Sequence, residues 1–124
     1  MVRKRTSCEL TECSVKPALE ERALITLEQA VGLMAVFKIL ANDTRLRLLH
    51  ALIRSGEMCV NDLARATDMK PQAVSNQLQR LVDRGIVSFR RNGNQIYYRV
   101  IDPCVVNLLD RGLCLTEDAE ERVR

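Results

Sequence analysis

Five cysteines are the residues of this 124-residue chain best suited to chemistry: Cys8, Cys13, Cys59, Cys104 and Cys114. An odd count argues against a disulfide framework, so we expect free thiols. Thiolates are soft ligands that select thiophilic ions. Cys8 and Cys13 indicate such a role most strongly, because their polar segment offers no core in which to pack them, and exposed thiols tend to bind or react.

Two other uses of these thiols stay open, and a third, catalysis, is not expected. A free cysteine often packs as a small buried hydrophobe, which fits Cys59 between Met58 and Val60 as well as Cys104 and Cys114. Cysteine pairs can also oxidise, which would make a redox switch. An enzyme with Cys59 as nucleophile needs a nearby base. His50 has no evident orienting group, so we predict that the chain is not an enzyme.

A second chemical pattern lies on a predicted helix from Pro71 to about Arg84. One side of this helix is apolar and carries Val74, Leu78, Leu81 and Val82. The opposite side carries Gln72, Ser75, Asn76, Gln79 and Asp83. Amide and hydroxyl groups can donate to and accept from base edges in the major groove of DNA. We therefore predict a DNA-reading helix, with Lys70 and Arg80 beside it to pair with phosphates.

Charge is segregated along the chain, which has a net charge of +3. Between Lys70 and Arg99 the only acid is Asp83, whereas the basic residues are Lys70, Arg80, Arg84, Arg90, Arg91 and Arg99. Acids dominate from Asp102 onward. This distribution predicts a cationic surface for a polyanion, with Arg90, Arg91 and Arg99 on a hairpin suited to the DNA backbone or minor groove.

The elements that must position these residues are mostly helices. Helical spacing, start signals and turn signals predict helices over 18–29, 30–41, 45–54, 60–67, 71–84 and 102–115, and strands over 86–91 and 95–101 around Asn92-Gly93-Asn94. The apolar helix 30–41 is expected to be buried on two sides, in a core and in a dimer interface. The fold class is mainly α with a β-hairpin wing, a winged helix-turn-helix.

Three regions are expected: a flexible arm over 1–17 with the cysteine pair, a DNA-binding and dimerisation domain over 18–115, and an acidic or polar tail over 116–124. No apolar run approaches the roughly 20 residues of a membrane span. The charged N-terminus lacks the apolar stretch of a signal peptide, so we expect a cytoplasmic protein without a membrane partner.

Several motifs in order resemble the ArsR/SmtB family of metal-sensing repressors over about residues 30–115. They are FKILANDTRLRLLHAL (37–52), GEMCVNDLA (56–64), QAVSNQLQRLVDRGIVSFRRNGNQIYYRV (72–100) and Asp102-Pro103-Cys104. The resemblance implies a homodimer with helical first and last elements at the interface. It also implies binding to double-stranded operator DNA and release of that DNA when a metal binds. A thiol-redox-responsive repressor on the same scaffold is the alternative.

The resemblance also implies two metal sites. In the subgroup with an N-terminal cysteine pair, Cys8 and Cys13 would meet Cys59, usually of the other subunit. A second site on the last helix, across the dimer, would use Asp102, Cys104, Cys114 and Glu117. This chain departs from the family at Cys59-Val60-Asn61, where the family often reads Cys-Val-Cys, and at Asn76, where the family often has His.

The implied effector is a thiophilic ion: Hg(II), As(III), Pb(II), Cd(II) or Zn(II). Asn61 stands where the family often has a second cysteine. This departure favours ions that can be bound by two or three sulfurs, namely Hg(II), As(III) or Pb(II).

Overall fold

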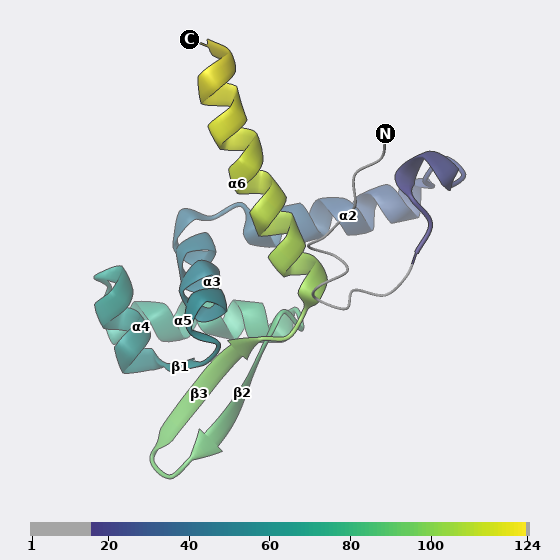
Figure 1. The fold of residues 1–124 in the computed structure, drawn as a ribbon. Helices are drawn as coiled ribbons and strands as arrows, with labels where there is room; N and C mark the ends of the chain where they lie inside the picture. The colour runs from purple at the N-terminus through teal and green to yellow at the C-terminus, as the bar shows by residue number, and fades with distance from the viewer. Residues whose placement is uncertain (1–15, 124) are drawn as a thin grey trace.

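The computed structural model describes residues 16–123. Helices make up most of this part of the chain (Figure 1). In chain order the elements are the short 3-10 turn η1 (Leu19–Glu21), α2 (Leu27–Leu40), α3 (Asp43–Ser55), β1 (Met58–Cys59), α4 (Val60–Thr67), α5 (Pro71–Asp83), β2 (Val87–Asn92), β3 (Gln95–Val100) and α6 (Pro103–Val123). The predicted helix-turn-helix is α4 and α5, and β2 and β3 form the wing.

The sheet is antiparallel with strand order β1-β3-β2. The two-residue strand β1 was not predicted, because two residues are too few to show an alternating pattern. The hairpin turn is formed by Gly93 and Asn94, since Asn92 pairs with Gln95. Only Gly93 has a positive φ there, +68°, so a glycine at the first turn position makes this tight turn, not the Asn92-Gly93 pair that the sequence suggested.

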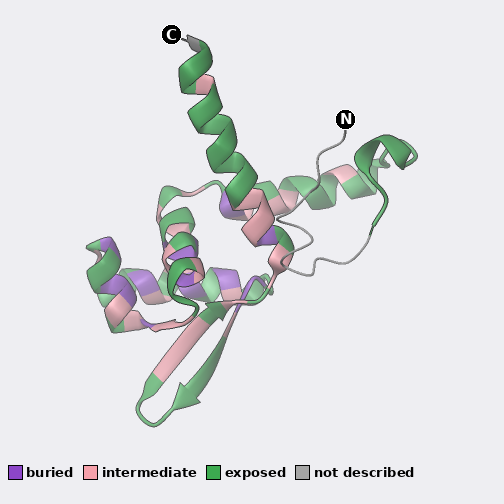
Figure 2. Cartoon of the chain, viewed as in Figure 1, coloured by how far each residue is buried: buried purple, intermediate pink, exposed green. Residues whose placement is uncertain are grey.

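The core lies where α3, α4, α5 and the base of the wing meet, as the buried segments in Figure 2 show. Eight side chains are almost completely enclosed: Leu48, Leu49, Leu52, Leu63, Val74, Leu78, Leu81 and Val87. The apolar side of α5 predicted from its spacing therefore faces this core, which leaves its polar side outward.

The N-terminal helix begins later than predicted. Residues 22–26 are not helical, and α2 starts at Leu27. The Thr26 hydroxyl oxygen accepts from the Gln29 amide at 3.1 Å, and the Gln29 side chain accepts from the Thr26 amide at 2.9 Å. This reciprocal pair is a capping box, which fixes the first turn, so the Thr-x-x-Gln spacing was the overlooked signal.

The last helix is longer than predicted. It was expected to end near Leu115, but α6 continues to Val123 and rises away from the body (Figure 1). Residues 116–123 contain neither glycine nor proline, and Ala119, Glu120, Glu121 and Arg122 favour helix. Within the described range 16–123, no helix has the length and apolar character that crossing a bilayer requires.

Candidate nucleic-acid interface and cysteine sites

Helix α5 presents the polar face that the sequence predicted. Gln72, Asn76, Gln79 and Arg80 are exposed on it, Ser75 is half-buried, and the exposed Lys70 precedes its first turn. The Gln72 side-chain amide donates to Asn76 Oδ1 at 3.2 Å. The Gln79 amide likewise donates to Asp83 Oδ1 at 2.9 Å. Each pair holds its side chains along the helix surface and leaves further donors and acceptors for a ligand.

The turn between α4 and α5 sets the angle at which that face is presented. Asp68 adopts the left-handed conformation, with φ 57° and ψ 49°, and ends α4. The buried Thr67 hydroxyl donates to the Leu63 carbonyl at 2.7 Å. The Arg47 guanidinium donates to the Thr67 carbonyl at 3.1 Å, so α3 also holds this turn.

A second contact that the sequence did not reveal ties α5 to the helices before it. The Arg45 guanidinium donates from Nε to the Ile39 carbonyl at 2.6 Å and from Nη1 to Gln77 Oε1 at 2.8 Å. Gln77 is a half-buried polar residue close to the apolar side of α5. The position of Gln77 near the apolar side of α5 was the one sequence feature that could have indicated its structural role.

The wing carries arginines with different surroundings. Arg91 is exposed and makes no ion pair with any residue of the described range. Arg90 donates to both carboxylate oxygens of Glu57, at 2.8 and 2.9 Å, and its guanidinium carbon lies 5.1 Å from the centre of the Tyr97 ring. The hydrogen bond from Arg90 lowers the pKa of Glu57 and raises the pKa of Arg90.

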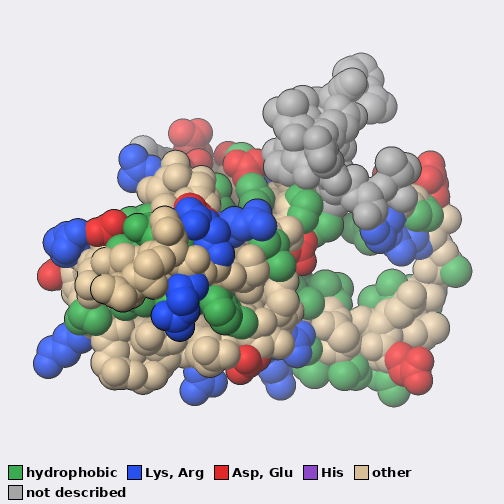
Figure 3. Space-filling model, turned by 90° about the horizontal axis from the view of Figure 1, so that it is seen from below, with side chains coloured by type: hydrophobic (Ala, Val, Ile, Leu, Met, Phe, Trp, Pro, Cys, Tyr) green, Lys and Arg blue, Asp and Glu red, His purple; other side chains and the backbone are tan. Residues whose placement is uncertain are grey.

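Glu57 was not singled out from the sequence, because Arg90 lies 33 residues further along the chain and no local spacing joins them. Figure 3 views the molecule from below, the side on which the wing lies in Figure 1, and shows Lys and Arg side chains projecting at several places. The wing adjoins α5, because β2 contacts that helix, and both expose polar and cationic side chains. We call these exposed side chains of α5 and the wing the reading face.

The three cysteines of the described residues are not gathered into one site within a single chain. Cys59 is buried at the start of α4, whereas Cys104 and Cys114 are exposed on α6. Ten residues of helix separate Cys104 from Cys114, about 15 Å along the axis. Residues 16–123 contain no group of three or more His, Cys, Asp or Glu side chains that could hold a metal ion. The predicted ligands Cys8 and Cys13 lie outside the described residues.

The other predicted ligands of the last helix have mixed surroundings. Asp102 Oδ1 accepts from the Cys104 amide at 2.9 Å, so this carboxylate caps the first turn of α6. Glu117 is exposed, one helical turn beyond Cys114. The thiols and carboxylates of α6 are suitable ligands for a thiophilic ion. Cys104 and Cys114 of one chain lie too far apart to bind the same ion, so a site that uses both would need a second chain.

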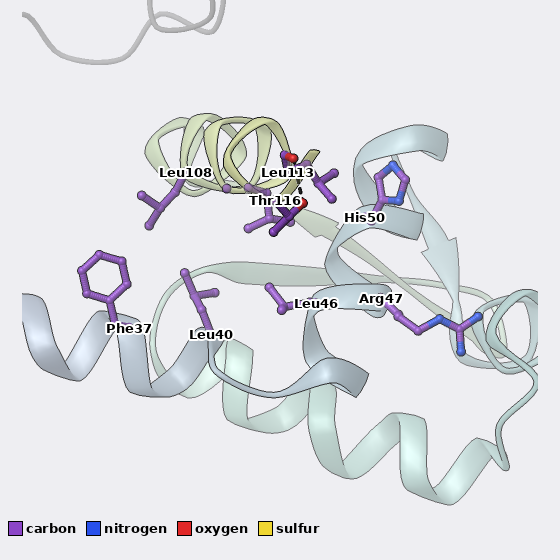
Figure 4. Close-up of a pocket in the computed structure, with 10 residues that line it drawn as sticks. Phe37, Leu40, Leu46, Arg47, His50, Leu108, Leu113 and Thr116 are labelled. Atoms are coloured by element: carbon purple, nitrogen blue, oxygen red, sulfur yellow. Dashed lines mark hydrogen bonds between the residues drawn. The ribbon is translucent and has the colours of Figure 1, made fainter. Parts of the chain in front are cut away.

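An apolar cavity of about 450 Å³ opens between α2, α3 and α6 (Figure 4). Phe37 and Leu40 rise from α2 toward Leu108 of α6, and Arg47 points away from them. The complete lining is Phe37, Leu40, Leu46, Arg47, His50, Leu108, Leu109, Gly112, Leu113 and Thr116.

Apolar side chains are also exposed on α2 and α6. They include Leu27, Val31, Leu33, Met34, Phe37, Leu113 and Leu115, and Leu27 is 80% exposed. Helix α2 was predicted to be buried on two sides. Its Val36, Ile39 and Leu40 pack on the core, whereas the side with Val31 and Met34 is open in the single chain.

Comparison with known proteins matches residues 42–88 to the model of the bacterial regulatory protein arsR family. The chain is 42% identical over 85 residues to the transcriptional repressor SmtB homolog of Synechocystis sp., covering 68% of this chain and 64% of that protein. It is 27% identical to the cadmium resistance transcriptional regulatory protein CadC of Listeria innocua (90% and 93% covered). It is 38% identical to the arsenic resistance transcriptional regulator ArsR1 of Pseudomonas putida (69% and 66%).

Solved structures agree in fold. The AntR antimony-specific transcriptional repressor superposes with a TM-score of 0.76 at 62% identity, covering 88% of this chain and 98% of that one. A homodimeric winged helix-turn-helix DNA-binding domain, Mb0332 of Mycobacterium bovis, superposes with a TM-score of 0.67 at 33% identity, covering 82% and 95%. The winged helix-turn-helix fold predicted from the sequence is thereby confirmed.

Proposed function

This chain belongs to the ArsR/SmtB family of metal-responsive transcriptional repressors, and we propose that it is a homodimer released from its operator by a trivalent metalloid, antimony(III) or arsenic(III). The observation that carries the choice of effector is the 62% identity, over 88% of this chain, with a repressor described as antimony-specific. This choice agrees with the sequence argument for an ion satisfied by two or three sulfurs.

Operator binding is assigned to the reading face. Helix α5 would enter the major groove, where Gln72, Ser75, Asn76 and Gln79 meet base edges. Lys70, Arg80 and Arg91 would pair with phosphates, because their side chains are exposed beside that helix or on the wing. A homodimer places two such helices about 34 Å apart, on successive major-groove faces of the same side of the duplex.

The dimer is supported by the open apolar surface. A chain this small rarely leaves so many large apolar side chains in water, and contiguous apolar patches mark interaction sites. Both α2 and α6 carry such side chains, and the cavity between them could receive side chains of a second copy. The homodimeric Mycobacterium bovis neighbour gives a precedent for this assembly.

The effector site is proposed on α6. Cys104 and Cys114 are exposed, and they lie about 80° apart around the helix, on neighbouring sides. If two copies of α6 run antiparallel and the dimer axis passes near Leu109, midway between the two cysteines, Cys104 of one copy comes level with Cys114 of the other. Their thiolates would bind the metalloid, with Glu117 one turn away and Asp102 serving the helix start.

The arm site of Cys8, Cys13 and Cys59 is kept as a second candidate. Cys59 is only 5% exposed in this conformation, so it would have to become accessible before it could act as a ligand. Whichever site operates, metalloid and operator would bind preferentially to different dimer geometries. Linkage then requires each ligand to weaken the other's binding by the same factor.

The test is an operator-release titration with the full-length reduced dimer. A duplex is first selected from a random pool by the metal-free protein, labelled, and followed by fluorescence anisotropy while Sb(III), As(III), Hg(II), Pb(II), Cd(II) or Zn(II) is added. We expect release by Sb(III) and As(III) at the lowest concentrations, and recovery on addition of a competing dithiol. The proposal fails if the two metalloids leave the complex intact at concentrations that saturate the thiols.

Serine variants locate the site. Cys104→Ser and Cys114→Ser should retain operator binding without effector and lose release, because serine supplies no soft ligand. Cys59→Ser and the double variant Cys8→Ser/Cys13→Ser are the matched controls and should respond like wild type. The reverse pattern would move the effector site to the arm.

A further inference from the structure

Glu57, Arg90 and Tyr97 form a group that crosses the sheet. Glu57 immediately precedes β1, Arg90 lies on β2, and Tyr97 lies on β3, the strand between them. The register pairs Arg90 with Tyr97, so both side chains lie on one face of the sheet. The Arg90 guanidinium therefore passes over the Tyr97 ring to reach Glu57, and joins the two outer strands.

The geometry of this contact is that of a bidentate pair. Nε and Nη2 of Arg90 each donate to a different oxygen of Glu57, at 2.8 and 2.9 Å. Two parallel bonds fix the orientation of the guanidinium as well as its distance. The face of the guanidinium is also engaged, since its carbon lies 5.1 Å from the centre of the Tyr97 ring.

Strand β2 has few contacts of its own with the body beyond its base. Val87, at that base, is buried, but residues 89–95 are exposed. Phe89 contacts Tyr98 with ring centres 5.8 Å apart, and Tyr98 packs against the core and pairs with Met58 of β1, so this contact reaches the body only through β3. The Glu57–Arg90 pair is thus a direct tie between β2 and the segment that leads into α4.

We infer that Glu57, Arg90 and Tyr97 act as a clamp that sets the direction of the wing, and that Arg90 is a positioning residue of the reading face. This inference rests on the proposed DNA-binding function. It revises the role predicted for Arg90 from the sequence and leaves Arg91, its neighbour on the other face of β2, as the phosphate-binding arginine of the wing.

Glu57→Gln distinguishes a phosphate-binding role of Arg90 from a role in positioning the wing. If Arg90 binds phosphate and Glu57 only competes for it, removal of a negative charge near DNA strengthens operator binding. If the pair is a clamp, the same change releases the wing and weakens binding by about two- to fivefold, the effect expected when a modest exposed pair controls the binding-competent fraction. Thermal unfolding should change little, because exposed ion pairs contribute little to stability.

Salt dependence supplies a second readout, measured by anisotropy on the metal-free protein with the selected duplex. Arg91→Gln, the matched control, should reduce the slope of log K against log salt by about one, as expected for loss of a phosphate contact. Arg90→Gln should weaken binding with the slope unchanged, and the double variant Glu57→Gln/Arg90→Gln should bind like Arg90→Gln alone. Tighter binding by Glu57→Gln, or a slope reduced by Arg90→Gln as much as by Arg91→Gln, would overturn the inference.

An independent measurement needs no DNA. Heteronuclear NOE values of the Gly93 and Asn94 amides report picosecond-to-nanosecond motion at the wing tip. They should fall in Glu57→Gln and Arg90→Gln and stay at the wild-type value in Arg91→Gln. Equal values in all four proteins would exclude the clamp. If wild type binds no duplex at all, the proposed function fails, and the NOE comparison still decides whether the clamp exists.

Discussion

If α5 reads DNA as proposed, single side chains on this helix would distinguish one DNA sequence from another. Asn76 is exposed and accepts a hydrogen bond from Gln72 through its side-chain oxygen, so its own side-chain N–H groups are not used in this contact. An amide that reads a base edge is worth about 1–3 kcal/mol of discrimination. The half-buried Ser75 beside it is packed more tightly and has less freedom to adapt.

We therefore predict that Asn76→Ala lowers the preference for the selected duplex over a scrambled one by roughly ten- to hundredfold. Its melting temperature should stay at the wild-type value, since the side chain is exposed. Lys70→Gln is the comparison: it should weaken binding to both duplexes alike and reduce the salt slope by about one. Competition anisotropy measures both quantities, and an unchanged preference in Asn76→Ala would remove this residue from the reading face.

Titration of Glu57 gives a prediction at the same scale. Its pKa is lowered in the folded protein, chiefly by the hydrogen bond from Arg90. The stabilisation from this shift is present above the pKa of an unfolded glutamate and is lost as pH falls through the lowered pKa of the folded state. Wing NMR shifts should therefore be constant from about pH 5.5 to 8, above the ordinary glutamate range. Glu57→Gln should abolish any acid transition, and a transition near neutral pH would contradict the assignment.

At the scale of elements, short local signals predicted the centre of the fold well. Helix α4 runs over Val60–Thr67 as predicted, and α5 begins at Pro71, which suits the first turn of a helix. Errors gathered at helix ends. The capping box that starts α2 at Leu27 was overlooked, and α6 continues past Leu115 to Val123, because the residues after it favour helix and none of them is glycine or proline.

Asn42, the residue that caps the start of α3, allows a direct test of such a signal. Its side-chain oxygen accepts from the Arg45 amide at 2.9 Å and starts α3, which supplies three of the fully enclosed core leucines. Asn42→Ala should lower the free energy of unfolding by about 1 kcal/mol. Asn42→Asp, which keeps an acceptor oxygen at the same place, should stay near wild type. Urea unfolding followed by circular dichroism measures the difference, and equal midpoints for Ala and wild type would show that the cap contributes nothing.

The arrangement of the whole molecule explains why the sequence predicted the polar face of α5 but not the Glu57–Arg90 pair. The polar face of α5 is a property of one helix, so the spacing of Gln72, Asn76 and Gln79 was enough to find it. The Glu57–Arg90 pair depends on how β1 and β2 lie on either side of β3, which no local pattern encodes. The cysteine ligands are harder still, because Cys104 and Cys114 can share an ion only if two chains combine.

The proposed dimer interface can be tested by a substitution on α2. Leu27 is 80% exposed in the single chain, so Leu27→Glu should leave the fold of the protomer intact. If α2 lies in the dimer interface, the change buries a charge and should raise the dimer dissociation constant by at least tenfold. Glu28→Lys is the control, since it alters the charge of the same helix without removing apolar area. Sedimentation velocity at several concentrations measures the equilibrium, and an unaltered dimer would place the interface elsewhere.

The direction of α6 has a consequence for kinetics. The helix carries Glu117, Asp118, Glu120 and Glu121 away from the body, while Arg91 and the wing lie at the other end of the molecule (Figure 1). In the proposed homodimer the components of this charge separation perpendicular to the twofold axis cancel, and the component along the axis remains as an electric dipole moment. If the dimer binds operator DNA as proposed, the field of the nucleic acid would turn it along this axis during diffusion, before any contact forms. Association would then be faster at low ionic strength, where this field is less screened.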